Sequence, residues 1–230
     1  MTVDDFVKLL DAITKLIGAL AWPATLAFVL VRFGPAMNEF FSSLGEFTFK
    51  GGGFEASAKR KQAEAAAALA AAVAARPEPN ASPESAARTA RDAAKVVAEV
   101  VTPRVLREAS RATVLWVDDR PENNAYERES LSALGVTFVL AKSTEEAQLR
   151  LRHQRFDAII SDMGRPGDSR AGYTLLESLQ AKSDRTPFVI YASSNTPEHR
   201  AEARERGALG STNRASELFE LVLSALRIAA

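Results

Sequence analysis

The C-terminal half of the chain alternates between two hydrophobic patterns. Short apolar runs typical of buried strands are each followed by a longer segment with helical periodicity. The apolar runs predict strands at 113–117, 136–140, 157–161 and 187–191, with a less apolar one at 208–211. The segments that follow them predict helices at 121–134, 143–154, 172–181, 197–205 and 215–228. This alternation predicts a doubly wound α/β domain with a five-stranded parallel sheet.

Local signals mark several of the predicted helix starts. Pro121 and Pro197 stand at first helical positions, where a missing backbone N–H costs nothing. Ser143 with Glu146 forms a capping box, and Thr196 is a candidate cap for the helix at 197–205. The predicted strands are apolar on consecutive positions, which is expected for a sheet covered on both faces.

Acidic side chains close two of the predicted strands. Asp118 and Asp119 end the first strand, Asp162 ends the third, and Ser193 follows the fourth. Because the carboxyl ends of parallel strands share one edge, three carboxylates and a hydroxyl are expected to converge there. Such a cluster suits a hard divalent cation, with one carboxylate left as a nucleophile. Taken singly, Asp119 is better explained as a helix cap and Asp162 as a turn residue, and only their joint placement favours a site.

Residues 112–230 resemble the receiver domain of two-component response regulators, on the order and spacing of these acids together with Pro166 and Gly207-Ala208. The resemblance implies a flavodoxin-like fold in which Asp162 is the phosphoacceptor. It implies Mg²⁺ held by Asp118, Asp119, Asp162 and the backbone of Gly164, and contact of Ser193 with the incoming phosphoryl group. It also implies a histidine kinase or another phosphodonor as partner, and an effector protein that the sequence does not name.

Three positions depart from the receiver pattern. Arg214 stands where the family keeps a Lys that pairs with the acyl phosphate, Ser211 stands where an aromatic residue is usual, and Ala215 replaces the usual Pro. Arg is a planar fork and not an equivalent point charge. Two interpretations stay open: a phosphorylated receiver with an altered readout, and a phosphorylation-independent pseudo-receiver acting as a protein-interaction module.

Other classes of protein fit less well. A Mg²⁺-dependent phosphohydrolase usually spaces its first-strand acids as Asp-x-Asp, whereas Asp118 and Asp119 are adjacent, so we expect no enzyme. The 29 basic and 29 acidic residues balance, and no nucleic-acid partner is expected. The absence of Cys excludes disulfides and thiolate metal sites.

An uncharged run, Leu16 to Val31, dominates the N-terminus. As a helix it spans roughly 24 Å, and extension back to Leu9 brings it near the roughly 30 Å of a bilayer core. We predict a membrane-anchor helix within residues 1–35, in the bacterial inner membrane. Basic residues follow the run, which favours a cytoplasmic receiver. A buried helix in a soluble oligomer and a signal peptide are the alternatives, although no A-x-A cleavage pattern follows.

Between the anchor and the receiver the composition changes twice. Residues 36–54 form an aromatic and Gly-rich juxtamembrane segment, and its three consecutive glycines lack the Lys-Ser/Thr of a phosphate-binding loop. Residues 55–110 are rich in Ala and predict two helices separated by a Pro-rich break near 77–83. They predict a helical hairpin, or a stalk through which copies of the chain form a homo-oligomer. Thr102-Pro103 ends the second helix or starts a further turn.

Overall fold

A computed structural model describes residues 53–75, 83–194 and 196–229 of the 230-residue chain. The predicted anchor within 1–35 and almost all of the 36–54 segment lie outside these residues. Within the part that the structure describes, no helix is both long and apolar enough to cross a membrane.

The sheet is the predicted one. Five parallel strands lie in the order β2-β1-β3-β4-β5. Their bounds are β1 Thr113–Val117, β2 Thr137–Ala141, β3 Ala158–Ser161, β4 Phe188–Tyr191 and β5 Gly210–Thr212. β1 has the predicted bounds, whereas β2 begins one residue later than predicted and β5 two residues later. The strand order places β1 and β3, which carry the acidic residues, side by side at the centre of the sheet.

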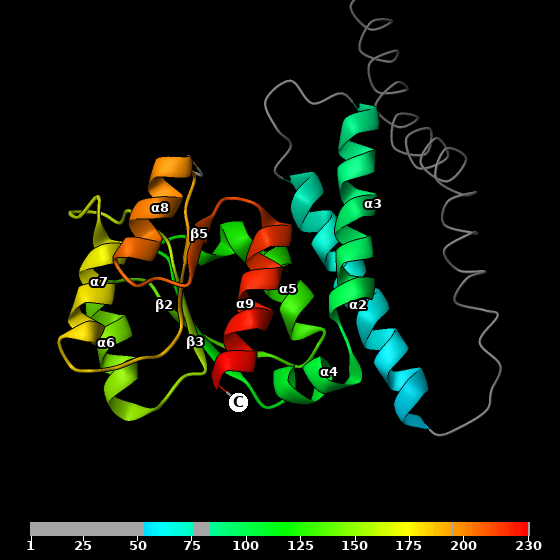
Figure 1. Ribbon diagram of the computed structural model, residues 1–230, viewed down its shortest axis with the longest axis horizontal. Coiled ribbons are helices and arrows are strands. Elements are labelled where there is room, and N and C mark those ends of the chain that lie inside the picture. The colour runs from blue at the N-terminus through cyan, green and yellow to red at the C-terminus, as the bar shows by residue number, and fades with distance from the viewer. Residues whose placement is uncertain (1–52, 76–82, 195, 230) are drawn as a thin grey trace, which may run out of the picture. The chain divides into compact units, whose positions relative to one another are not determined.

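Helices cover both faces of the sheet, as the continuously apolar strands predict (Figure 1). Alternate residues of β1 point to opposite faces: Trp116 joins the core beside α9, and Leu115 joins the core beside α7. The face beside α9 is covered by α5 and α9, and the other by α6, α7 and α8. The bounds of these helices are α5 Ala125–Ser132, α6 Thr144–His153, α7 Ala171–Gln180, α8 Pro197–Glu205 and α9 Ala215–Ala229.

The helix predicted at 121–134 divides in two. A short 3-10 helix, η1 (Pro121–Asn124), precedes α5, which ends at Ser132. Asp119 does not cap η1, because Arg120, the residue between Asp119 and Pro121, occupies the cap position. Arg120 makes no side-chain capping bond. The other predicted caps are present: Ser143 Oγ accepts from Glu146 N at 3.1 Å, and Thr196 Oγ1 accepts from His199 N at 3.3 Å.

The Ala-rich segment forms three helices, α2 (Gly53–Ala75), α3 (Pro83–Val100) and α4 (Pro103–Ala109). Of the two roles open for Thr102-Pro103, the structure has a new helix: Thr102 caps α4, its Oγ1 accepting from Val105 N at 3.3 Å. α2 begins two residues before the predicted start at 55, and α3 begins at the end of the predicted Pro-rich break.

The α2–α3 helical pair packs onto the face of the α/β domain that α5 and α9 cover (Figure 1). Leu69 of α2 and Val97 of α3 are fully buried in the same apolar cluster as Trp116 of β1 and Phe219 of α9. Gln62 of α2 also donates to the carbonyl oxygen of Val101 at 2.5 Å. The helical pair and the sheet therefore share one continuous core.

Candidate active site at the carboxyl edge of the sheet

Hydrogen bonds to its backbone and to both of its carboxylate oxygens fix Asp118 at the end of β1. Its backbone N donates to the carbonyl oxygen of Ala141 at 2.9 Å, which extends the β1–β2 ladder by one residue. Its Oδ1 accepts from the backbone N of Arg120 at 2.8 Å, and its Oδ2 accepts from the side chain of Asn124 in η1. These hydrogen bonds fix the turn after β1, so the buried carboxylate of Asp118 is held at the carboxyl edge of the sheet.

Asp119, the next residue, is less constrained. Its Oδ2 lies 3.6 Å from Nε of Arg120, whose side chain is 72% exposed. A pair this open to solvent is screened and contributes little to stability. Asp119 consequently keeps its carboxylate available at the mouth of the site.

Asp162 lies in the same position at the end of the neighbouring strand. Its backbone N donates to the carbonyl oxygen of Val117 at 3.0 Å, so the ends of β3 and β1 are in register. Burial raises the pKa of the Asp162 carboxyl to about 6. The Arg165 guanidinium acts against this shift, whereas the negative charges of Asp118 and Asp119 add to it.

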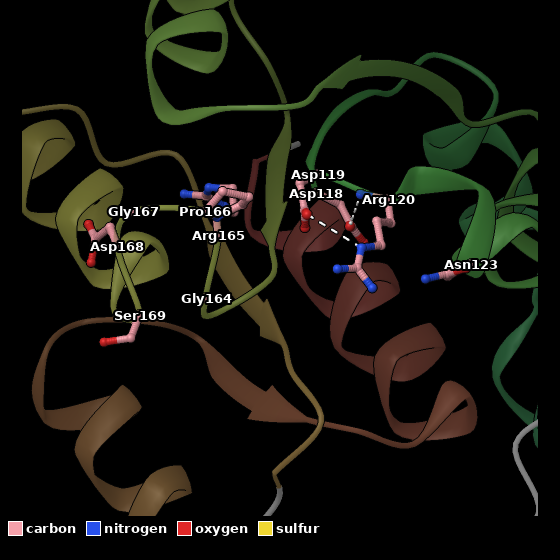
Figure 2. A pocket seen from close by; sticks show the side chains of 10 residues that line it. All are labelled: Asp118, Asp119, Arg120, Asn123, Gly164, Arg165, Pro166, Gly167, Asp168 and Ser169. Atoms are coloured by element: carbon pink, nitrogen blue, oxygen red, sulfur yellow. Dashed lines mark hydrogen bonds and ion pairs between the residues drawn. The ribbon is translucent and has the colours of Figure 1, made fainter.

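The three predicted carboxylates do meet. One oxygen from each of Asp118, Asp119 and Asp162 lies within 4.8 Å of the others. Beside them is a pocket of about 680 Å³, with Asp118 and Asp119 on one wall and the loop 164–169 on the other (Figure 2). Gly164, the expected backbone ligand, also lines this pocket.

The donor set fits Mg²⁺. The three carboxylates offer hard oxygen ligands, and the open pocket that Asp118 and Asp119 line leaves room for water and a phosphate oxygen, which is the coordination that Mg²⁺ favours. A divalent cation would also relieve the repulsion among three neighbouring negative charges. Asp118, Asp119, Asp162 and the carbonyl of Gly164 are the residues that would hold it.

The first turn of α7 packs closely against the backbone of Asp162 and Met163. The backbone N of Gly172 donates to the carbonyl oxygen of Met163 at 2.9 Å. A Cβ atom at position 172 would lie only 2.6 Å from the carbonyl oxygen of Asp162, closer than real Cβ contacts allow. Only Gly lets the first turn of α7 approach the end of β3 in this way.

The two remaining predicted residues are Ser193 and Arg214. Both contact residues at the end of β5 or the start of α9. Ser193 is exposed after β4, and its carbonyl oxygen accepts from the side chain of Asn213 at 3.2 Å. Arg214 precedes α9 and pairs with Glu217 in the first turn of that helix at 3.4 Å, and its backbone N donates to Thr212 Oγ1 at 3.0 Å. The side chain of Arg214 is 55% exposed.

The positively charged side chain that contacts Asp162 is that of Arg165, which the sequence did not assign to the site. Arg165 lies in the loop after β3, and its Nη1 is 2.5 Å from Asp162 Oδ1. Its side chain is only 4% exposed. The sequence signal was the unusual charge of the 164–171 loop, but a loop residue gives no indication of which way its side chain points.

Comparison with known proteins identifies the domain that carries this site. The family model described as the response regulator receiver domain matches residues 114–222. These residues form a response regulator receiver domain. The resemblance inferred from Asp118, Asp119 and Asp162 is therefore confirmed.

One relative of this receiver domain is a gliding motility regulatory protein from Myxococcus xanthus, 31% identical over 102 residues. The match covers 44% of this chain and 13% of that protein, so the chain spans a small part of the relative's length.

Solved structures of receiver proteins are similar over the same half of the chain. A Francisella response regulator receiver domain is 20% identical, covering 52% of this chain and 100% of that chain at a TM-score of 0.47. Chemotaxis response regulator CheY4 of Vibrio cholerae is 26% identical, with 52% and 98% covered and a TM-score of 0.42. TrrA from Thermotoga maritima, solved in complex with Mg²⁺ and BeF, is 21% identical, with 50% and 98% covered and a TM-score of 0.43.

Proposed function

We propose that the chain acts in a phosphorelay and that its receiver domain accepts a phosphoryl group on Asp162. The observation that carries this proposal is the convergence of Asp118, Asp119 and Asp162 within 4.8 Å at the carboxyl edge of the sheet. The adjoining pocket of about 680 Å³ gives a phosphodonor access to that edge. Of the three acids, Asp162 alone follows β3, and it faces the pair that follows β1 and would hold the cation.

The chemistry requires little of the protein beyond positioning and charge. A side-chain oxygen of Asp162 attacks the phosphorus of a phosphohistidine, forming a P–O bond as the P–N bond breaks, and the departing imidazole takes up a proton. Bound Mg²⁺ supplies neutralisation of the charge that develops on the phosphoryl oxygens. Asp118 and Asp119 would orient the cation, and the Ser193 hydroxyl would contact the incoming group.

The phosphodonor would be a histidine kinase or a small acyl phosphate, and output would pass to an effector protein or through the N-terminal helices. We further propose that residues 9–32 anchor the chain in the bacterial inner membrane with the receiver in the cytoplasm. The uncharged run and the basic residues after it support this assignment. Recovery of the full-length chain in the soluble fraction without detergent would refute the anchor.

A second candidate is a pseudo-receiver that acts without phosphorylation, as a protein-interaction module. Two contacts favour it: Arg214 is paired with Glu217, and Asp162 is already paired with Arg165. In this case the acidic edge would be a structural remnant, and the surface of the domain would bind a partner constitutively.

Labelling separates the two candidates. The full-length chain is incubated with Mg²⁺ and a small acyl phosphate, and its intact mass is measured. We expect a mass increase of one phosphoryl group that Asp162→Asn abolishes. Asp92→Asn is the control, because Asp92 is a 69% exposed carboxylate of α3 outside the acidic cluster, and it should still be labelled. Unlabelled wild-type chain, with a cognate kinase as donor as well, would favour the pseudo-receiver.

A further inference from the structure

Arg165 is held at the acidic edge by three side chains, two at the end of β3 and one at the start of α6. Its Nη1 donates to Asp162 Oδ1 at 2.5 Å and to Ser161 Oγ of β3 at 2.9 Å. Its Nη2 donates to Thr144 Oγ1, at the start of α6, at 3.0 Å. Burial of a guanidinium is costly unless it is paired and hydrogen-bonded, and these contacts meet that requirement.

The backbone of the loop is also fixed. Arg165 and Asp168 exchange two backbone hydrogen bonds, at 2.9 and 3.0 Å, in an isolated antiparallel bridge. The Asp168 carboxylate then accepts from Arg170 N at 2.8 Å and from Thr174 Oγ1 at 2.7 Å, which joins the loop to α7. The guanidinium is therefore a built part of the site, although its Nε is buried without a hydrogen-bond partner.

We propose that Arg165 is a tethered internal cation that competes with the divalent metal for Asp162 and so sets how readily the site is loaded. This inference rests on the function proposed above. Arg165 contacts one of the three carboxylates that would bind the metal, so its positive charge would lie close to a metal ion held by Asp162. Arg214, which stands at the family's lysine position, is instead paired with Glu217 and does not have this role.

The expected size of the effect follows from simple electrostatics. Even at the dielectric constant of water, a unit charge roughly 5 Å from a divalent ion weakens its binding by about tenfold. Removal of the Arg165 charge should therefore tighten Mg²⁺ binding by at least about tenfold. Arg165→Lys keeps the charge and should stay near the wild-type affinity.

The test is a Mg²⁺ titration of the full-length chain in mild detergent, followed by the fluorescence of Trp116 in a Trp22→Phe background. Arg165→Met removes the charge at similar volume, and Arg165→Gln is a second variant that retains a donor for Ser161. Arg214→Met is the control. The side chain of Arg214 is exposed and pairs with Glu217 instead of the acidic cluster, so its loss should change the affinity less than about threefold.

Labelling with an acyl phosphate gives an independent readout. In Arg165→Met, the Mg²⁺ concentration for half-maximal labelling should fall about tenfold, while labelling at saturating Mg²⁺ persists. Unchanged or weaker Mg²⁺ binding in both Arg165→Met and Arg165→Gln overturns the inference, and so does loss of the folded state in both. If wild type is never labelled but Arg165→Met still binds Mg²⁺ more tightly, the proposed phosphorelay function fails and the competition between Arg165 and the metal stands.

Discussion

Leu69 tests whether the helical pair α2–α3 is part of the receiver's folded core. Its side chain is fully buried in the cluster that contains Trp116 of β1 and Phe219 of α9. Leu69→Ala removes three carbon atoms from this cluster and leaves a cavity, which costs about 2–5 kcal/mol of unfolding free energy. With a urea m-value of about 2 kcal/mol/M, a loss of 3 kcal/mol lowers the midpoint by about 1.5 M.

Two probes of urea unfolding make the result decisive. Circular dichroism follows all helices, and the fluorescence of Trp116, in a Trp22→Phe background, follows the sheet. If the helical pair α2–α3 and the sheet share one core, Leu69→Ala lowers the midpoints of both probes together. Ile228→Ala is the control, because Ile228 is 64% exposed near the end of α9 and its truncation should cost less than about 1 kcal/mol. An early transition in circular dichroism with an unchanged Trp116 midpoint would show that the helices unfold separately, and would refute the shared core.

Three further predictions concern the interior and the site. Tyr191→Phe deletes a buried hydroxyl that donates to Glu127 at 2.8 Å, and should cost about 1–3 kcal/mol in urea denaturation; a cost below 0.5 kcal/mol contradicts this. Gly172→Ala should lower the melting temperature and weaken Mg²⁺ binding, because the new methyl meets the Asp162 carbonyl; a wild-type melting curve contradicts the close approach. Because the pKa of Asp162 is raised to about 6 in the folded chain, the folded state binds more protons than the unfolded state between pH 4 and 6. Wild type should therefore lose stability relative to Asp162→Asn as pH rises through that window, and a rise would contradict the sign.

Much of the receiver half was predictable because its signals are local. Strands buried on both faces read as apolar runs, and caps such as Ser143 and Thr196 depend on a residue three positions later. The meeting of Asp118 and Asp162 followed from the rule that parallel strands end at one edge, together with the family pattern. The bounds of β5 were least accurate, since a strand of three residues carries little periodic signal.

The features that the sequence did not predict depend on tertiary contacts. α2 is so rich in Ala that no single apolar stripe identifies its buried face, and its packing on α5 could not be assigned. The family pattern placed Arg214 at the phosphate, but Glu217, three residues later in the first turn of α9, pairs with it instead. Arg165 was only one of several charges in its loop, and the direction of its side chain is set by Asp162, Ser161 and Thr144 together.

Locating the phosphoryl group on the chain tests the proposed transfer most directly. The full-length protein is incubated with an acyl phosphate, with and without Mg²⁺, then reduced with borohydride, which converts a phosphorylated Asp to homoserine. Peptide mass spectrometry then reads each acidic position. Homoserine at position 162, dependent on both the phosphodonor and Mg²⁺, is the predicted result. Homoserine at another acid, or none at position 162 when Mg²⁺ is bound and a cognate kinase is supplied, would contradict Asp162 as the phosphoacceptor.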